Sequence, residues 1–226
     1  MISIEPQAFF FDFDGVVVDS ERQHMYATLE ALKDQPEMLF TEKFYFEELL
    51  GFDDVGLFQY LWEKNKTPLP DNELKALMLR KNQILMQRLA SDAIFFPGVI
   101  DFIHSFKTKQ IPIAVVSGAR RKEILACIEK GKLQPYFEFV VAADDVQFSK
   151  PNPESYTKGF TQMRDKIPNL DLKNCWVIED SPTGIESAKG AGMNVIGITN
   201  SLSREHLTQA NHIVSHYTEI QVTKLA

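Results

Sequence analysis

The sequence Ala8-Phe9-Phe10-Phe11-Asp12-Phe13-Asp14-Gly15 joins an apolar run of strand length to two carboxylates. In a β-strand, residues i and i+2 project to the same face, so the side chains of Asp12 and Asp14 would point into one space. Gly15 then permits a tight turn that a side chain would hinder. Two acids at the carboxyl end of a buried strand cost free energy unless a cation or a shared proton offsets their charge. The stretch therefore predicts a buried strand that delivers acids to a binding site.

Beyond residue 92, apolar runs of strand length alternate with helical patterns. Together with the first run, the predicted strands are residues 8–12, 111–116, 137–141, 176–178, 195–198 and 212–214. The predicted helices between them cover about residues 99–109, 120–131, 154–164 and 183–190. This alternation is typical of a parallel α/β sheet. Such sheets bind ligands outside the carboxyl ends of their strands.

Residues 20–92 have a different character, because helical stripes of leucine, methionine and aromatic residues replace the strand runs. The longest stripe follows Asp71, a possible helix N-cap. No run in this span has a convincing strand pattern. We therefore expect a helical bundle at residues 20–92, inserted into an α/β core made of residues 1–19 and 93–226.

The overall charge excludes some classes of partner. The chain has 226 residues, of which 44% are hydrophobic, enough for a substantial core. It carries 31 acidic and 24 basic residues, a formal net charge of −7. This balance argues against a general nucleic-acid or anionic-membrane surface. It does not exclude a small phosphorylated substrate, since a few placed cations decide that.

The cysteines and the N-terminus suggest where the protein works. Cys127 and Cys175 have neither the number of a disulfide framework nor the spacing of a metal site, so we interpret each as a packed free thiol. The segment Met1–Pro6 lacks the basic region of a secretory signal, and no apolar run reaches the length of a membrane span. We therefore expect a soluble protein in the reducing cytoplasm.

Several polar residues follow a predicted strand or lie in a loop after one, namely Asp12, Asp14, Ser117, Lys150, Glu179 and Asp180. Parallel topology would gather them at one edge of the sheet. The acids can hold Mg²⁺, a hard cation that prefers oxygen ligands and often shares them with phosphate. The ion, the lysine, the serine and loop amides can together stabilise a phosphoryl group. An aspartate can then attack phosphorus, while a second carboxyl protonates the leaving oxygen.

Four segments resemble, in order, the four motifs of the haloacid dehalogenase superfamily: Asp12-Phe13-Asp14-Gly15-Val16-Val17-Val18-Asp19-Ser20, Ser117-Gly118, Lys150-Pro151 and Glu179-Asp180-Ser181-Pro182-Thr183-Gly184. Residues 150–156 and 188–193 add support, and the match covers residues 8–200. Any one motif alone would be weak, whereas four in order are specific. The resemblance implies an α/β fold with a Rossmann-like parallel-sheet core, and it implies that residues 20–92 are the helical cap inserted in that family.

The resemblance also implies roles for these residues. Asp12 would be the nucleophile and Asp14 the general acid and base. Asp12, the backbone carbonyl of Asp14, and Asp180 would bind Mg²⁺, with Glu179 either a further ligand or a hydrogen-bond partner of the ligands. The phosphoryl group would be held by Ser117, Gly118 and Lys150. Because family members that act on carbon–halogen bonds or phosphonates usually lack the second acid, Asp14 favours a phosphate ester as substrate.

The remaining question is whether the chain is a hydrolase or a mutase. His24 and Lys81 resemble cap residues of β-phosphoglucomutase and its sugar-phosphatase relatives, and each is a candidate substrate contact. The mutase, however, uses a cap arginine to hold a second phosphate, and the corresponding segment Gly51-Phe52-Asp53-Asp54-Val55 contains no arginine. This difference favours a phosphatase. A sugar phosphomutase and a catalytically silent phosphometabolite-binding protein stay as alternatives.

Overall fold

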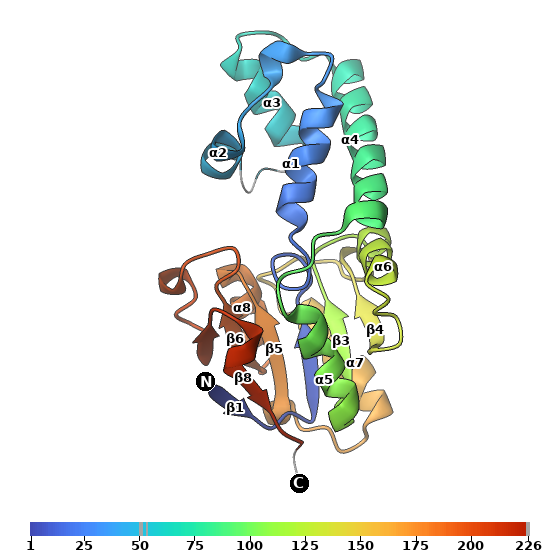
Figure 1. Cartoon of the computed structure of the whole chain (residues 1–226), viewed down its shortest axis with the longest axis vertical. Helices are drawn as coiled ribbons and strands as arrows, with labels where there is room; N and C mark the ends of the chain where they lie inside the picture. Colours follow the sequence, from blue (N-terminus) through green and yellow to red (C-terminus); the bar gives the residue numbers. More distant parts are fainter. Residues whose placement is uncertain (50–51, 53, 225–226) are drawn as a thin grey trace. The chain divides into compact units, whose positions relative to one another are not determined.

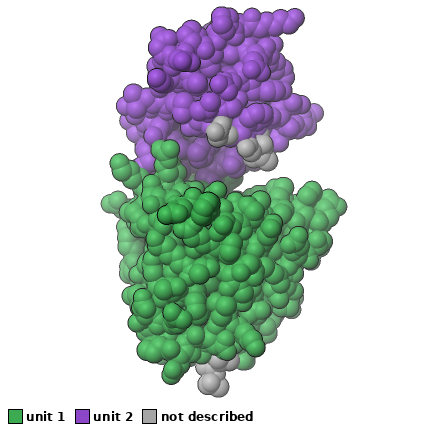
Figure 2. All heavy atoms as spheres, turned by 180° about the vertical axis from the view of Figure 1, so that it is seen from behind, with its two compact units in different colours: residues 1–19, 93–226 green, residues 20–92 purple. Residues whose placement is uncertain are grey.

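A computed structural model describes residues 1–49, 52 and 54–224. The chain divides into two compact units (Figure 2), one made of residues 1–19 and 93–226 and the other of residues 20–92. We call the first the α/β unit and the second the helical unit. Among the described residues, no helix combines the length and the apolar character needed to cross a membrane.

The α/β unit is built on a six-stranded sheet that is parallel throughout, with the strand order β4-β3-β2-β5-β6-β7 (Figure 1). The strands are β2 Ala8–Phe11, β3 Ile113–Val116, β4 Phe137–Val141, β5 Cys175–Glu179, β6 Asn194–Ile198 and β7 His212–Val214. The predicted parallel α/β sheet is confirmed. Because β2 lies between β3 and β5, the residues that follow these three strands emerge side by side.

Helices connect the strands of this sheet. They are α5 Val99–Lys109, α6 Arg121–Lys130, α7 Glu154–Lys166 and α8 Pro182–Gly190, with short 3-10 turns η3 Ala143–Asp145, η4 Leu172–Asn174, η5 Arg204–His206 and η6 Tyr217–Glu219. A second, two-stranded parallel sheet pairs β1 Ile2–Ile4 with β8 Ile220–Val222. No pattern in the sequence predicts this small sheet. It joins the two ends of the α/β unit.

Strand β3 begins later than its apolar run. The run starts at Ile111, but Pro112 has no N–H to donate to a neighbouring strand, and β3 begins at Ile113. The Pro112 carbonyl still accepts a hydrogen bond from the amide of Phe9 at 3.1 Å. The proline therefore moves the first residue of the strand without detaching the segment from β2.

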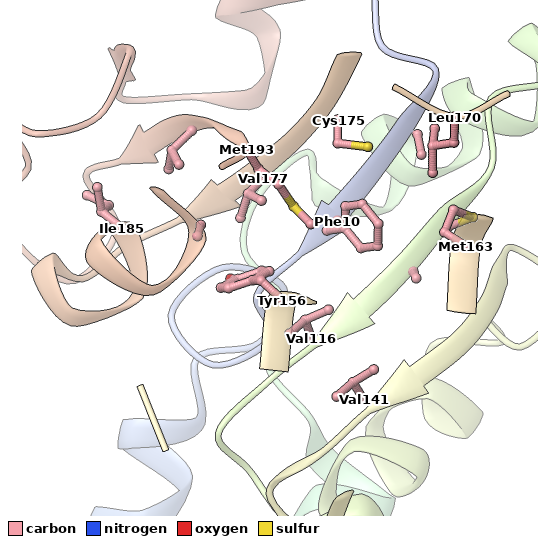
Figure 3. Close-up of a cluster of buried hydrophobic side chains, with 14 of the residues drawn as sticks. Phe10, Val116, Val141, Tyr156, Met163, Leu170, Cys175, Val177, Ile185 and Met193 are labelled. Carbon is pink, nitrogen blue, oxygen red and sulfur yellow. The ribbon is translucent and has the colours of Figure 1, made fainter. Parts of the chain in front are cut away.

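The side chains of β2 alternate between the two faces of the sheet. Phe10 belongs to an apolar cluster with residues of α7 and α8, among them Tyr156 and Ile185 (Figure 3). Phe9 points to the opposite face, where its ring centroid lies 4.8 Å from that of Phe106 on α5. Burying a phenylalanine side chain is worth about 2–3 kcal/mol. Both faces of β2 are therefore fully covered, and only its carboxyl end leads to polar groups.

The helical unit contains α1 Ser20–Ala31, η1 Pro36–Met38, α2 Glu42–Phe44, the π-helical turn η2 Tyr45–Leu49, α3 Asp54–Lys64 and α4 Asp71–Asp92. No strand occurs among the described residues of this unit. Its core is an apolar cluster that includes Met25, Phe58 and Trp62. The parallel core with an inserted helical unit confirms the predicted fold class.

Both cysteines are buried free thiols, as the sequence predicted. Burial raises the pKa of Cys127 and of Cys175 to about 12. At neutral pH each therefore stays protonated and acts as a small apolar side chain.

Candidate active site

Residues 12–19, which we call the acidic loop, begin where β2 ends. The amide of Asp12 donates to the carbonyl of Ile178 at 3.1 Å, so the residue leaves the sheet in register with β5. The chain then turns at Gly15, whose φ of +74° lies in the left-handed region, and the Gly15 amide donates to Val18 O at 2.9 Å. Asp12 is 6% exposed. The turn thus holds a buried carboxylate at the carboxyl edge of the sheet.

Lys150 is the cation of this edge. Its Nζ contacts Asp12 Oδ1 at 2.5 Å and Glu179 Oε1 at 2.7 Å, and it also donates to Val116 O at 3.2 Å and to the Tyr156 hydroxyl at 3.3 Å. Burial alone would lower the pKa of Lys150, but the carboxylates of Asp12 and Glu179 raise it well above its ordinary value. The lysine is therefore charged and fixed between the ends of β2, β3 and β5.

Ser117 follows β3 directly and faces the second acid of the loop. Its Oγ donates to Asp14 Oδ2 at 3.1 Å and accepts from the amide of Ala119 at 2.9 Å. Ser117 is 2% exposed, whereas the neighbouring Gly118 is exposed. The hydroxyl and the carboxyl thus form a pair beside Lys150 and Asp12.

Glu179 ends β5 and is almost completely surrounded. Its Oε1 accepts from Lys150 and, at 2.9 Å, from the Tyr156 hydroxyl, while its Oε2 accepts from the amide of Asp180 at 3.1 Å and from the Ser181 hydroxyl at 3.2 Å. A Cβ at Gly184 would lie 1.8 Å from Oε1, so α8 reaches this carboxylate only because residue 184 has no side chain. Glu179 therefore ties the lysine to the start of α8.

Asp180 lies beside the loop that carries Asp12. Its Oδ2 accepts a hydrogen bond from the hydroxyl of Ser201, and a Cβ placed at Gly15 would lie only 1.7 Å from the same oxygen. The missing side chain at residue 15 therefore serves two purposes, a positive φ and the close approach of Asp180. This explains in physical terms why a glycine follows the two acids.

Three of these acids could hold a cation together. Asp12, Glu179 and Asp180 each place one carboxylate oxygen so that all three oxygens lie within 4.8 Å of one another. Burial, followed by the charge of Glu179, raises the pKa of Asp12 well above its ordinary value. The same two causes raise the pKa of Asp180 to about 7. Grouped buried carboxylates of this kind repel one another, and a divalent ion with oxygen ligands would offset that repulsion. The donor set therefore fits a hard divalent cation.

The two candidates at residues 24 and 81 belong to the helical unit. Lys81 is 2% exposed and its ammonium forms an ion pair with Asp54 at the start of α3. His24 is half-buried on α1, where its carbonyl accepts from the Thr28 hydroxyl at 2.9 Å. Residues 51 and 53, which entered the comparison with the mutase, lie outside the described residues. A substrate contact for either candidate stays a prediction.

Sequence analysis missed several residues that support the site. Tyr156 lay inside the quoted segment 150–156, but nothing in the pattern distinguished its hydroxyl from a core ring. Asn200 and Ser201 follow a predicted strand, the same signal that selected the other polar residues, and applying it to strand β6 would have found them. Gly184 ends the fourth motif, but the need for a glycine there is explained only by the packing of α8 against Glu179.

Known proteins share both the sequence pattern and the fold. The family model described as haloacid dehalogenase-like hydrolase matches residues 9–198. Validoxylamine A 7'-phosphate phosphatase from Streptomyces hygroscopicus subsp. limoneus is 31% identical over 219 residues, which cover 93% of this chain and 94% of that protein. The phosphorylated carbohydrates phosphatase of Thermotoga maritima is 27% identical over 200 residues, 87% of each chain. The crystal structure of β-phosphoglucomutase from Clostridium difficile has a similar fold, with a TM-score of 0.68 at 23% identity and coverage of 95% and 92%.

Proposed function

The chain belongs to the haloacid dehalogenase-like hydrolase family, and on that premise we propose that it is a Mg²⁺-dependent phosphatase of small phosphate monoesters. The proposal rests on one observation: an ammonium group and a hydroxyl group each contact one of two neighbouring carboxylates. Lys150 contacts Asp12, and Ser117 contacts Asp14. A buried cation and a donor next to paired acids fit a reaction in which negative charge moves onto and off a phosphoryl group.

In the proposed reaction Asp12 attacks phosphorus and forms an aspartyl-phosphate, and the phosphorus–oxygen bond to the alcohol breaks. Asp14 gives its proton to the leaving oxygen. In the second step Asp14 takes a proton from the water that attacks the phosphoryl group, the bond between phosphorus and the Asp12 oxygen breaks, and inorganic phosphate leaves with Asp12 restored as a carboxylate. We assign Ser117, Gly118 and Lys150 to binding the phosphoryl oxygens in both steps.

We propose that the metal is held by Asp12, Asp180 and the backbone carbonyl of Asp14. When bound, Mg²⁺ would supply positive charge that stabilises the phosphoryl oxygens and offsets the buried carboxylates. Glu179 belongs to the three acids that could hold a cation, but both of its oxygens already accept hydrogen bonds, so we assign it to holding Lys150 and the start of α8. The thiols of Cys127 and Cys175 are compatible with a reducing cytoplasm, where we propose that the protein works.

For the substrate we propose a sugar phosphate or a related metabolite. One relative is named as a phosphatase of validoxylamine A 7'-phosphate and another as a phosphatase of phosphorylated carbohydrates. We propose that residues 20–92 act as the cap that selects the alcohol being released. Within that unit, Lys81 is already paired with Asp54, which leaves it poorly suited to capture a second phosphate. This pairing supports a phosphatase over a phosphomutase.

A panel of phosphate monoesters tests this function. We expect Mg²⁺-dependent release of inorganic phosphate from a generic aryl phosphate and, faster, from at least one sugar phosphate. Interconversion of sugar 1- and 6-phosphates without net release of phosphate would show a mutase instead. Binding of sugar phosphates with neither release nor interconversion across the whole panel would show a silent binding protein.

A further inference from the structure

The segment after β6 contacts the acidic loop and its neighbour Asp180. Asn200 Nδ2 donates to the carbonyl of Gly15 at 2.9 Å, and the hydroxyl of Ser201 donates to Asp180 Oδ2. Both residues lie just beyond the stretch that the family model matches, which ends at residue 198. These contacts therefore come from a part of the chain to which no motif assigns a role.

Ser201, Asp180 and Gly15 are packed in direct contact. A Cβ built at Gly15 would lie 1.7 Å from Asp180 Oδ2 and 2.6 Å from Ser201 Oγ, so the carboxylate and the hydroxyl both fill the space that a side chain would occupy. The terminal torsion of an aspartate is broad and about two-fold, so the carboxylate plane is not fixed by its own rotamer. A hydroxyl that binds one oxygen restricts that plane, and one oxygen of this carboxylate lies within 4.8 Å of carboxylate oxygens of Asp12 and Glu179.

We propose that Ser201 is a positioning residue, which orients the carboxylate of Asp180 for the divalent cation. The inference rests on the proposed metal-dependent function, since it gives Asp180 the role of a ligand. Carboxylates that bind metals are in turn hydrogen-bonded, and such partners affect the affinity of the site. The hydroxyl of Ser201 supplies that hydrogen bond without contributing a charge of its own.

Other contacts hold the acidic loop in place independently of Ser201. Asn200 binds Gly15, and the hydroxyl of Tyr217 donates to the carbonyl of Val16. Tyr217 is also packed against Phe102 of α5, with 5.4 Å between the ring centroids. We therefore expect removal of the Ser201 hydroxyl to leave the position of the loop unchanged and to affect the orientation of Asp180.

The test measures Mg²⁺ binding to the whole chain by titration calorimetry, without substrate. Ser201→Ala should weaken Mg²⁺ affinity about ten-fold, the lower end of what the loss of such a partner costs. Ser201→Thr keeps the hydroxyl and should restore the affinity. The matched control is Ser203→Ala, which removes an exposed hydroxyl bonded to Glu205 and His206 and should leave the affinity unchanged.

Thermal unfolding gives a second readout that does not depend on activity. Each protein is compared with itself in chelator, and the upward shift of the unfolding temperature caused by added Mg²⁺ should be smaller in Ser201→Ala than in the wild type. Wild-type affinity in Ser201→Ala, or an equal loss in Ser203→Ala, would overturn the inference. Phosphate release is measured separately, so the phosphatase proposal can fail while a selective loss of Mg²⁺ affinity still supports the role of Ser201.

Discussion

Lys150 in the α/β unit and Lys81 in the helical unit are both largely shielded from solvent and paired with carboxylate groups, and the two lysines differ in their partners. In the α/β unit, Lys150 contacts Asp12 and Glu179, whose side chains are only 8% and 1% exposed. In the helical unit, Lys81 pairs with Asp54, whose side chain is 37% exposed. In the α/β unit, one ammonium faces two buried carboxylates, so their negative charge is not fully balanced. In the helical unit, one ammonium pairs with one carboxylate that is partly exposed to water. Unbalanced buried charge is costly, and it is found where a ligand supplies the missing charge.

Replacing each lysine by methionine tests this difference between the units and should give the largest effects. Lys150→Met leaves two buried carboxylates without their cation, and we expect a loss of about 3 kcal/mol in the free energy of unfolding. We also expect phosphate release to fall about 10³-fold, because a charge that stabilises the phosphoryl group is gone. Denaturant unfolding and phosphate release from an aryl phosphate measure the two effects.

Lys81→Met is the matched control in the helical unit. Since Asp54 remains partly in water, the loss should stay within about 1 kcal/mol, and aryl phosphate hydrolysis should be retained. Equal effects of the two substitutions on hydrolysis would contradict the difference that we draw between the units.

The next effect in size concerns the turn of the acidic loop. Gly15→Ala places a methyl group on the Asp180 carboxylate and a side chain at φ +74°. We expect phosphate release to fall about 100-fold, since displacements of about 1 Å in a site have such effects, and stability to fall by about 1–2 kcal/mol from the left-handed backbone.

Gly98→Ala separates these two causes. Gly98 has a φ of +82°, and a Cβ there would meet only the Tyr217 ring, at 4.0 Å. The Gly98→Ala variant should therefore lose a similar amount of stability and keep the wild-type rate of phosphate release. If both variants lost activity alike, the close approach of Asp180 to Gly15 would not be what the site requires.

Local patterns predicted most of the α/β unit and the residues gathered at its edge. The bounds of α5 and of β4 agree with the predicted residues 99–109 and 137–141. Ser117 and Lys150 lie far from the acidic loop in sequence, but Ser117 directly follows β3 and Lys150 lies in the loop after β4, and the structure has them in contact with Asp14 and Asp12. The rule that such strands end at one edge was sufficient to place them, while their chemical roles stay proposals.

What the sequence did not predict depends on contacts between distant segments. The hydroxyl of Tyr217 binds Val16 across 201 residues, and no periodicity encodes that contact. Strands β1 and β8 have only three residues each, too few for a recognisable alternation. In the helical unit, the helical pattern expected across residues 20–92 is interrupted at residues 42–49, which form a short helix, α2, capped by Thr41, and then the π-helical turn η2. Here the packing of the apolar cluster overrides the regular helical period.

The smallest expected effect is the loss of a single tyrosine hydroxyl, which can be compared between the two units. Tyr156→Phe removes a buried hydroxyl that donates to Glu179 and accepts from Lys150, and should cost about 1–2 kcal/mol of stability with a several-fold loss in phosphate release. Tyr60→Phe removes an exposed hydrogen bond to Glu48 in the helical unit and should leave both the unfolding midpoint and the activity unchanged. If Tyr156→Phe changed neither stability nor phosphate release, the site would need the aromatic ring of Tyr156 and not its hydroxyl.

We propose that the acids of the α/β unit perform the chemistry and that the helical unit affects which ester is used. One measurement tests it most directly: release of phosphate from an aryl phosphate, with Mg²⁺ and with a chelator, by the wild type and by Asp12→Asn. We expect Mg²⁺-dependent release by the wild type and none by Asp12→Asn. Release that persists in Asp12→Asn, or that is indifferent to the chelator, would contradict it.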